Sequence, residues 1–339
     1  MQTSLKNIAE KLNLSKTTVS WVLSGKAREK GISQATADRV LEYAAELHYR
    51  PNLLARSLNT GETRTIGLIM PSIADSFYSE VARAIESEAR CNGYSLMISS
   101  SEADVNREEE MIRLFLSKCV DGIIIAPTKY SKAEIVRLID GCYPFVTFDR
   151  YFPELDASYV IINNRDSSYM LTQHLIKKGC KRIALLTTNS YLTTMSLRQQ
   201  GYKEALIDSG FACKPDLIGE IGYQEYERNT YKVLDDIFLK VPDVDGFFFT
   251  THILAIEAFQ YFHDKGINTA FEMACIHEMP VFSVLAPKIN VAKMPVEEIG
   301  RNSVKILMEQ INHLKNNKGE KVPFHRKEMI LSCPLFFRS

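Results

Sequence analysis

From residue 66 onward, short runs of apolar and β-branched residues alternate with longer stretches in which apolar residues recur at helical spacing. The short runs are continuously apolar, which predicts strands buried on both faces, as in a parallel sheet covered by helices. Helical patterns at 77–93, 167–179 and 230–241 separate some of these runs, and several such patterns end at glycine or before proline. The predicted strands are 65–70, 94–100, 120–126, 144–149, 159–164, 182–188, 245–251, 273–277 and 289–294.

This alternation predicts an α/β fold, and the number of strands fits two sheets better than one. Open α/β sheets bind their ligands beyond the carboxyl ends of the strands. We therefore expect a binding site among the segments that follow 65–70, 144–149, 182–188 and 245–251.

Residues 1–48 differ in kind, because they show three helical patterns and no strand pattern. These patterns are "LKNIAEKLN", "KTTVSWVLS" and "SQATADRVLEYAAELH", and the third opens with Ser33, a favourable N-cap residue. Its predicted apolar stripe consists of Val40, Leu41, Ala44 and Leu47. About fifty residues are enough for a small three-helix unit.

The second helical pattern contains the only tryptophan of the chain. On a helical wheel Val19, Val22 and Leu23 form the apolar face, and Trp21 falls on the opposite side together with small hydroxyl residues. A helix that presents hydroxyls and an aromatic ring from a small basic unit is suited to a DNA groove. The alternative is that Trp21 packs under the third helix or against another domain.

Charge supports this distinction between the two parts of the chain. The whole chain is neutral, but residues 1–60 carry nine basic and five acidic side chains, a net charge of +4, which indicates that this part meets a polyanion. No apolar run has the roughly 18 residues of a membrane span, and the first residues do not resemble a signal peptide, so we expect a cytoplasmic protein. The seven cysteines form no C-x-x-C pair, so we expect neither a disulfide framework nor a zinc site. We also expect no other metal and no cofactor.

"IAEKLNLSKTTVSWVLSG" and "ISQATADRVLEYAAELHYRPNLLARSL" closely resemble the helix-turn-helix and hinge of the LacI/GalR family, which includes the lac and purine repressors. The remainder looks like the two-lobed, periplasmic-binding-protein-like core of that family. The resemblance implies a three-helix DNA-binding head at 1–48, a hinge helix and linker at 49–63, and an effector-binding and dimerisation core at 64–339. It further implies a first lobe of about 64–162 and 291–325 and a second lobe of about 163–290 and 326–339.

The resemblance makes 15–23 the recognition helix. Trp21 is a departure, because the family commonly has arginine there, and indole cannot replace its charged fork to guanine or phosphate. The segment 24–33 after this helix is longer than is usual in the family and basic, so it offers phosphate contacts, or is simply a solvated loop. The candidate DNA contacts in the head are Ser15, Lys16, Thr17, Thr18, Ser20, Trp21, Ser24, Lys26 and Arg28.

The hinge resemblance lies in "YRPNLLARSLNTG", where Pro51 suits a helix start and apolar residues follow at helical spacing. So short a helix is marginal alone and is expected to form on DNA. The resemblance makes Asn52, Ala55 and Leu58 the DNA contacts, with Leu58 as a paired minor-groove wedge. Two wedges require two chains, so a homodimer on a near-palindromic operator is expected. The alternative is a plain linker.

The resemblance also places a small-molecule effector between the lobes, with Phe77, Tyr78, Asp149 and Arg198 at family contact positions. Two further positions depart from the family. Thr251 stands in a segment that usually reads Ala-Asn-Asp, and His277 with Glu278 replaces a usual pair of aspartates. Losing these acceptors favours a sugar acid, a sugar phosphate or another anion over a plain sugar, unless the contacts have been rearranged or lost.

The function expected from these observations is a sequence-specific transcriptional regulator, most simply a repressor, controlled by a sugar or sugar derivative. An enzyme is the main alternative, but the chain contains no G-x-G-x-x-G after its first strand, no P-loop, no G-x-S-x-G and no H-E-x-x-H. A cytoplasmic solute-binding protein without DNA function would fit the core but leaves the basic head unexplained.

Overall fold

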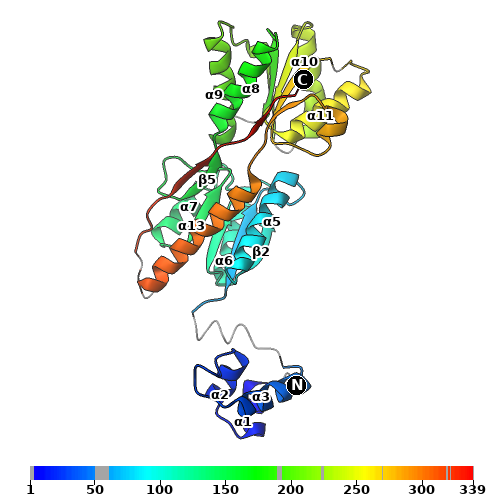
Figure 1. The fold of residues 1–339 in the computed structure, drawn as a ribbon. Coiled ribbons are helices and arrows are strands. Elements are labelled where there is room, and N and C mark those ends of the chain that lie inside the picture. Colours follow the sequence, from blue (N-terminus) through cyan, green and yellow to red (C-terminus); the bar gives the residue numbers. More distant parts are fainter. Residues whose placement is uncertain are drawn as a thin grey trace. The chain divides into compact units, whose positions relative to one another are not determined.

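The computed structural model describes residues 4–49, 61–188, 193–222, 225–268, 270–317, 320 and 322–338. The chain divides into two compact units, residues 1–63 and 64–339. Figure 1 shows the first unit as a cluster of short helices and the second as an α/β core with two lobes. The predicted fold class, a helix-turn-helix head with a core of two mainly parallel sheets, is confirmed.

The first unit consists of α1 (Leu5–Leu12), α2 (Lys16–Leu23) and α3 (Gln34–Glu46). Each helix starts at a serine N-cap whose hydroxyl accepts a backbone N–H, which satisfies a donor that the first turn leaves unpaired. Seven buried side chains close the core between the helices, namely Ile8, Ala9, Val19, Val22, Ala37, Val40 and Ala44. Leu41, predicted on the apolar stripe, is 49% exposed because it lies at the edge of that stripe, and Ala37 is buried instead.

The first lobe is a six-stranded sheet in the order β11-β5-β4-β3-β1-β2. Helices α5 (Ser76–Cys91) and α13 (Val296–Asn316) cover one face, and α6 (Val105–Ser117) and α7 (Lys132–Asp140) cover the other. All of its strand pairs are parallel, which agrees with their apolar sequences. The strands are β1 (Thr65–Met70), β2 (Ser95–Ser100), β3 (Gly122–Ile125), β4 (Phe145–Phe148), β5 (Tyr159–Ile162) and β11 (Glu328–Leu331).

The second lobe is a six-stranded sheet in the order β12-β10-β9-β8-β6-β7, in which only β12 is antiparallel to its neighbour. Its helices are α8 (Asn164–Lys177), α9 (Thr193–Asp208), α10 (Tyr226–Lys240), α11 (His252–Asp264) and α12 (Phe282–Leu285), with a 3-10 turn at Pro215–Leu217. Its strands are β6 (Ile183–Thr188), β7 (Ile218–Ile221), β8 (Gly246–Phe249), β9 (Glu272–Ile276), β10 (Asn290–Ala292) and β12 (Leu335–Phe336).

The chain crosses between the lobes three times, at 163, 293–295 and 332–334. The predicted lobe boundaries are therefore wrong in the C-terminal part of the chain. Residues 328–331 belong to the first lobe, because β11 pairs with β5, and residues 291–292 belong to the second lobe, because β10 pairs with β9. The strand at 328–331 is short and partly exposed and was not predicted, and the predicted strand at 289–294 does not show from its sequence which sheet it joins.

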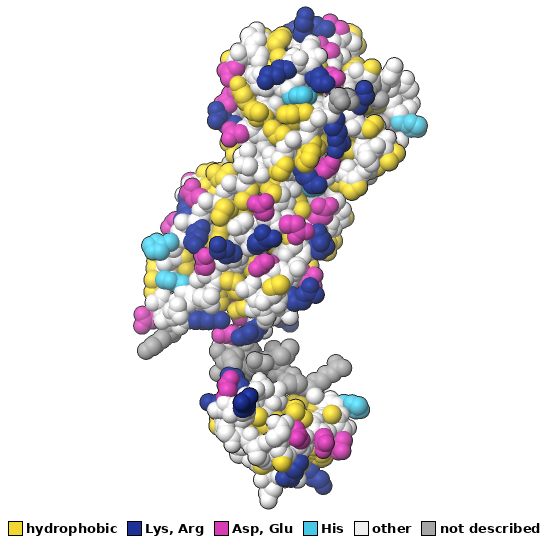
Figure 2. Space-filling view, in the orientation of Figure 1, with side chains coloured by type: hydrophobic (Ala, Val, Ile, Leu, Met, Phe, Trp, Pro, Cys, Tyr) yellow, Lys and Arg dark blue, Asp and Glu magenta, His cyan; other side chains and the backbone are white. Residues whose placement is uncertain are grey.

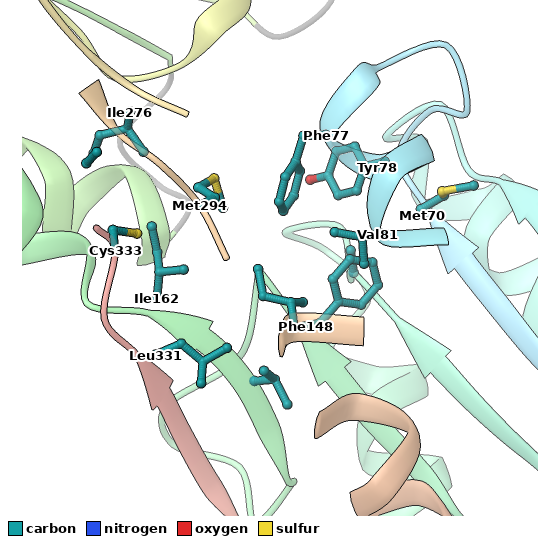
Figure 3. Close-up of a cluster of buried hydrophobic side chains, with 14 of the residues drawn as sticks. Met70, Phe77, Tyr78, Val81, Phe148, Ile162, Ile276, Met294, Leu331 and Cys333 are labelled. Carbon is teal, nitrogen blue, oxygen red and sulfur yellow. The ribbon is translucent and has the colours of Figure 1, made fainter. Parts of the chain in front are cut away.

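One buried apolar cluster runs from the first lobe into the second through these crossovers. Figure 3 shows Met294 and Cys333 of the crossovers together with Ile162 and Leu331 of the adjoining strand ends, across from the aromatic rings of α5. The carboxyl ends of β1 and β4 in one sheet and of β6, β8 and β9 in the other are followed by residues of a single cleft. This arrangement positions the candidate site.

Candidate functional site

The cleft lies between the two lobes and contains about 470 Å³ of atom-free space, including the part that is open to solvent. Every residue that the sequence analysis proposed as an effector contact lines it, namely Phe77, Tyr78, Asp149, Arg198, Thr251 and His277. The structure adds Asp75, Arg150, Thr188, Met195, Tyr226, His252, Ile253, Ile276 and Met294. Their positions are thus established, whereas the role of each as a ligand contact stays a prediction.

The first lobe contributes an aromatic wall and a carboxylate. Helix α5 starts here because the Asp75 side chain accepts the backbone N–H of Phe77 at 2.9 Å. The rings of Phe77 and Tyr78 meet edge to face, and the Tyr78 hydroxyl donates to Oδ2 of Asp149 at 2.7 Å. Asp149 follows β4 with a left-handed backbone (φ 58°), and Arg150 Nε lies 3.8 Å from the same carboxylate. The Asp149 carboxylate is therefore already engaged within the lobe.

The second lobe contributes a buried cation. Arg198, on α9, is only 2% exposed, and burial lowers the pKa of its guanidinium while the charge of Asp149 opposes the shift. Its Nε donates to Oδ1 of Asn164 at 2.8 Å and its Nη1 to the Thr250 carbonyl at 2.6 Å. The remaining Nη2 has the Met294 sulfur at 4.0 Å. These contacts fix the guanidinium at the edge of the cleft.

His277 follows β9, again with a left-handed backbone (φ 76°), and is 3% exposed. Its ring meets the rings of Phe77 and His252 edge to face, with centroids 5.6 and 5.1 Å apart. Neither ring nitrogen has a hydrogen-bond partner among the described residues. Burial lowers the pKa of His277 to about 3, helped by the neighbouring charge of His252 and opposed by Asp75, so the ring is neutral at physiological pH.

A polar contact joins the two lobes across the cleft. His252, at the start of α11, places Nε2 3.4 Å from the Asp75 carboxylate and 3.2 Å from the Ser76 hydroxyl. Thr251 is the N-cap of α11, and its hydroxyl accepts from the Leu254 N–H at 3.5 Å, so that oxygen is partly used in holding the helix start. Asp75 and His252 therefore form a contact between the two lobes in the wall of the cleft.

In the head, α2 exposes most of the side chains that were proposed to contact DNA. Lys16, Thr17, Ser20 and Ser24 are exposed, and Lys26 and Arg28 are exposed in the segment that follows. Ser15 and Thr18 are different, because the Ser15 hydroxyl accepts the Thr18 N–H at 2.9 Å and lies 2.8 Å from the Thr18 hydroxyl. These two side chains hold the helix start, which limits the bonds left for another partner.

Trp21 is half-buried and is not part of the apolar core of the head. Its ring instead has the ammonium group of Lys30 5.5 Å from its centroid, which is a cation–π distance. The segment between α2 and α3 turns at Gly25 (φ 75°), where the Lys26 N–H closes the helix on the Trp21 carbonyl. The longer basic segment and the unusual tryptophan are thus neighbours in space. Asn52, Ala55 and Leu58 lie outside the described residues.

Both units of the chain match models of known protein families. Residues 4–52 match the model of bacterial regulatory proteins of the lacI family, and residues 63–327 match the model of periplasmic binding proteins and the sugar-binding domain of the LacI family. The chain belongs to the LacI family.

Individual LacI-family relatives match over nearly the whole chain. The ribose operon repressor of Haemophilus influenzae is 27% identical over 317 residues, which cover 93% of each chain. Among solved structures, the lac repressor dimer bound to operator and the anti-inducer ONPF has a TM-score of 0.83 at 20% identity, covering 100% of this chain and 98% of that one. The complex of the regulator CelR with cellobiose has a TM-score of 0.72 at 21% identity, with 99% of both chains covered. The structural matches show that the fold is shared.

Some cleft residues of this LacI-family chain could have been found from its sequence. Asp75 precedes a helical pattern as an N-cap, and Arg150 and His252 are adjacent to predicted residues at the ends of predicted strands. Met195 and Tyr226 gave no such signal, because they come from helices whose starts the apolar pattern did not mark. None of the helices in the described part of the chain has the length and apolar character needed to cross a bilayer.

Proposed function

We propose that this LacI-family chain is a homodimeric, sequence-specific transcriptional regulator, acting as a repressor, whose operator affinity is set by a small molecule bound in the cleft. The observation that carries the proposal is the combination, in one chain, of a basic three-helix head and a two-lobed core with a polar cleft between its lobes. The head supplies DNA binding, and the core supplies ligand sensing.

The DNA-binding part of the proposal rests on α2. This helix exposes Lys16, Thr17 and Ser20 from a scaffold that buries Val19 and Val22, so its outer face is free for the major groove. The core is different, because acidic and basic side chains are interspersed over its face in Figure 2, without a large patch of one sign. A polyanion is therefore expected to engage the head rather than that face of the core.

For the hinge we propose that Asn52, Ala55 and Leu58 contact DNA, with Leu58 wedged into the minor groove beside its counterpart from a second chain. The support is the hinge sequence and the LacI-family assignment. Wedging requires two chains, so the operator is near-palindromic. Such a protein has its site of action in the cytoplasm, where the DNA is, and we assign it no catalytic step.

For the cleft we propose a sugar or a sugar derivative as effector. The named relatives include a ribose operon repressor, and CelR is described with cellobiose. Residues on both lobes line the cleft, and the Asp75–His252 contact spans it. A ligand that touches both lobes therefore favours one arrangement of the lobes over another, and the crossovers transmit that choice toward the N-terminal part of the core.

The test is a gel-shift titration of the full chain with genomic fragments, repeated at increasing salt. Site-selective retention that weakens steeply with salt is expected, because Lys and Arg contacts release counterions from the DNA. Leu58→Gln is expected to weaken this retention, and a substitution in the core far from the cleft, Leu239→Gln, serves as the matched control because Leu239 is 80% exposed. Absence of site-selective retention by the unmodified chain would overturn the proposed function.

A further inference from the structure

The acidic side chains of the cleft and its buried arginine differ in the partners that the protein gives them. The Asp149 carboxylate accepts from Tyr78 and has Arg150 beside it, and the Asp75 carboxylate caps α5 and faces His252. Both acidic side chains of the cleft wall are therefore engaged with donors from the protein itself. A ligand gains little by offering further donors to them.

Arg198 differs, because no carboxylate of the described residues is within ion-pair distance of it. Its hydrogen bonds go to an amide oxygen and a backbone carbonyl, with a thioether sulfur beside Nη2, and none of the described carboxylates forms an ion pair with it. A guanidinium that is 2% exposed and hydrogen-bonded only to neutral acceptors has lost its hydration, and the Asp149 carboxylate that acts on it lies beyond ion-pair distance. The most favourable addition to such a group is an anion.

Two further polar groups of the second lobe line the cleft without a partner. Both ring nitrogens of His277 and the hydroxyl oxygen of Thr188 are buried and have no hydrogen-bond partner among the described residues. His277 is 3% exposed and Thr188 is 1% exposed. Buried polar atoms without partners are unfavourable in the protein alone and are satisfied by a ligand with complementary atoms. With Arg198 they are polar groups that the second lobe contributes to the cleft, and the first lobe contributes the rings of Phe77 and Tyr78, of which Phe77 meets the His277 ring edge to face.

We propose that the effector is a sugar-sized anion whose oxyanion group, a carboxylate or a phosphate, binds to Arg198 and His277, with Thr188 as an additional donor. The proposal rests on the proposed function, because it names the ligand class of that same cleft. Phe77 and Tyr78 would then cover the uncharged body of the ligand. His277 is the specificity-determining residue, since its two buried ring nitrogens have no partner among the described residues and can bond an oxyanion.

Binding of an anion beside His277 should be accompanied by uptake of a proton on its ring. The groups that act on His277 are His252, Asp75 and Arg198, together with Lys293, whose ammonium lies 3.1 Å from Glu278. An anion bound against the ring favours its protonated form, whereas the free ring is neutral. Anion affinity should therefore fall by up to about tenfold for each unit of pH rise, over the range where the bound ring holds a proton and the free ring does not.

The experiment follows the His277 ring by NMR in the full chain labelled with 15N-histidine. The probes are sulfate, which does not titrate in the working range, and the matched pair glucuronate and glucose. We expect sulfate and glucuronate to shift the His277 resonances saturably with the stated pH dependence, and glucose to bind at least about tenfold more weakly than glucuronate. Glucose 6-phosphate distinguishes a phosphate site from a carboxylate site.

His277→Asn identifies the resonances and tests the role, because asparagine tolerates the left-handed backbone and does not titrate. We expect this variant to keep weak anion binding through Arg198 but to lose its pH dependence. His263→Asn, an exposed histidine outside the cleft, is the control and should leave anion binding unchanged.

Two results would overturn the inference. One is glucose binding at least as tightly as glucuronate with no dependence on pH, and the other is no saturable shift of His277 with any of the anions. Gel shifts on the same samples separate these results from failure of the proposed function. If site-selective DNA retention persists, the chain remains a regulator whose effector is not an anion of this class.

Discussion

Trp21 occupies a position on α2 that the family commonly gives to arginine, and the structure pairs it with a lysine from the following segment. The indole is half-buried, and Lys30 lies over its ring. An aromatic ring that holds a cation presents both an apolar edge and a positive charge to a neighbouring surface. The Trp21–Lys30 pair thus places an apolar ring and a positive charge side by side next to α2.

Removing the indole should affect DNA binding more than folding. We expect Trp21→Ala to lower operator affinity about tenfold and to relax base selection, while the melting temperature changes little, because Trp21 is outside the core of the head. Anisotropy titrations and thermal unfolding measure the two effects. A fall in melting temperature as large as that of a core variant such as Val19→Ala would show that Trp21 is a core residue.

Lys30→Gln tests the other half of the pair. Loss of the Lys30 charge should weaken binding to all DNA sequences about equally. It should also reduce the slope of log affinity against log salt concentration by about one. An exposed lysine on α1, Lys11, provides the matched control variant. An unchanged salt slope in Lys30→Gln would show that Lys30 makes no phosphate contact.

Glu108 on α6 gives the core a pH dependence of its own. The residue is fully buried, its Oε2 accepts the Thr128 N–H at 2.9 Å, and burial raises its pKa to about 7, opposed in part by hydrogen bonds and by Arg150. A carboxyl with a raised folded-state pKa binds more protons in the folded than in the unfolded chain, so its stability contribution is lost as pH rises from about 4.3 through 7.

Glu108→Gln should remove this dependence. At pH 5 we expect the variant and the parent to unfold at similar temperatures, and at pH 8 we expect the variant to be more stable by roughly 3 kcal/mol. His277 contributes the opposite slope at lower pH in both proteins, so the difference between them isolates Glu108. Thermal unfolding across pH measures it, and a difference that does not grow with pH would contradict the assignment.

At the scale of single residues, the sequence predicted cleft-lining residues that follow strands and missed contacts that depend on tertiary placement. Asp149 and His277 stand directly after apolar runs, so their place at the sheet edge could be inferred. The partnership of Asp75 with His252 could not, because the two residues come from different lobes. That Arg198 has only neutral hydrogen-bond acceptors likewise depends on which groups the fold brings near it.

Helices α8 and α9 form the most closely packed pair of the second lobe. A Cβ at Gly201 would lie 2.1 Å from the Arg165 carbonyl oxygen, so only glycine permits this approach of the two backbones. Arg198 is one turn away on α9, and its acceptor Asn164 is at the start of α8. The spacing of the helices therefore sets the position of the guanidinium in the cleft.

Gly201→Ala should force the helices apart. We expect a loss of roughly 1–3 kcal/mol in unfolding free energy, together with weaker ligand binding, because the Arg198–Asn164 bond lengthens. Gly210→Ala is a useful comparison, since no atom lies near its Cβ position and its cost comes from the backbone alone (φ 78°). If Gly201→Ala retained the parent's stability, the helices would have to be able to separate without cost.

At the scale of elements, the apolar runs predicted the central strands, because burial on both faces leaves a continuous signal. Strand β7 was missed because its pattern alternates, and β11 and β12 were missed because they are short, edge-lying and partly exposed. These strands are recognised only through their pairing partners. The wrong lobe boundary at 328–331 followed from the same lack of signal, whereas the strand at 289–294 was predicted but its sequence does not show which sheet it joins.

In the whole core, Asn163 connects two of the three crossovers. Its side-chain oxygen accepts from the Cys333 N–H at 3.0 Å and from the Ser167 hydroxyl at 2.8 Å, and its own N–H donates to the Leu331 carbonyl at 2.9 Å. The amide therefore holds the first crossover against the third where the lobes meet. Motion of one lobe against the other must accommodate these bonds.

Asn163→Ala should leave two donors unpaired and lower the unfolding free energy by about 1–3 kcal/mol. We also expect a smaller difference in operator affinity between the ligand-free and the ligand-saturated protein, because the lobes are less firmly linked. Asn163→Asp keeps the acceptor and should retain most of both properties. Equal behaviour of the alanine and aspartate variants would exclude a role for the side-chain oxygen.

The late return of the chain to both sheets also imposes an order on biosynthesis. Strand β11 completes the first sheet by pairing with residues made about 170 positions earlier, and β12 completes the second. During translation the head, whose contacts lie within residues 4–49, can fold as soon as it leaves the ribosome, whereas the first lobe lacks a strand until residue 331 is made and the second until residue 336 is made. Each nascent chain thus acquires its DNA-reading unit well before the sensor that is to control it.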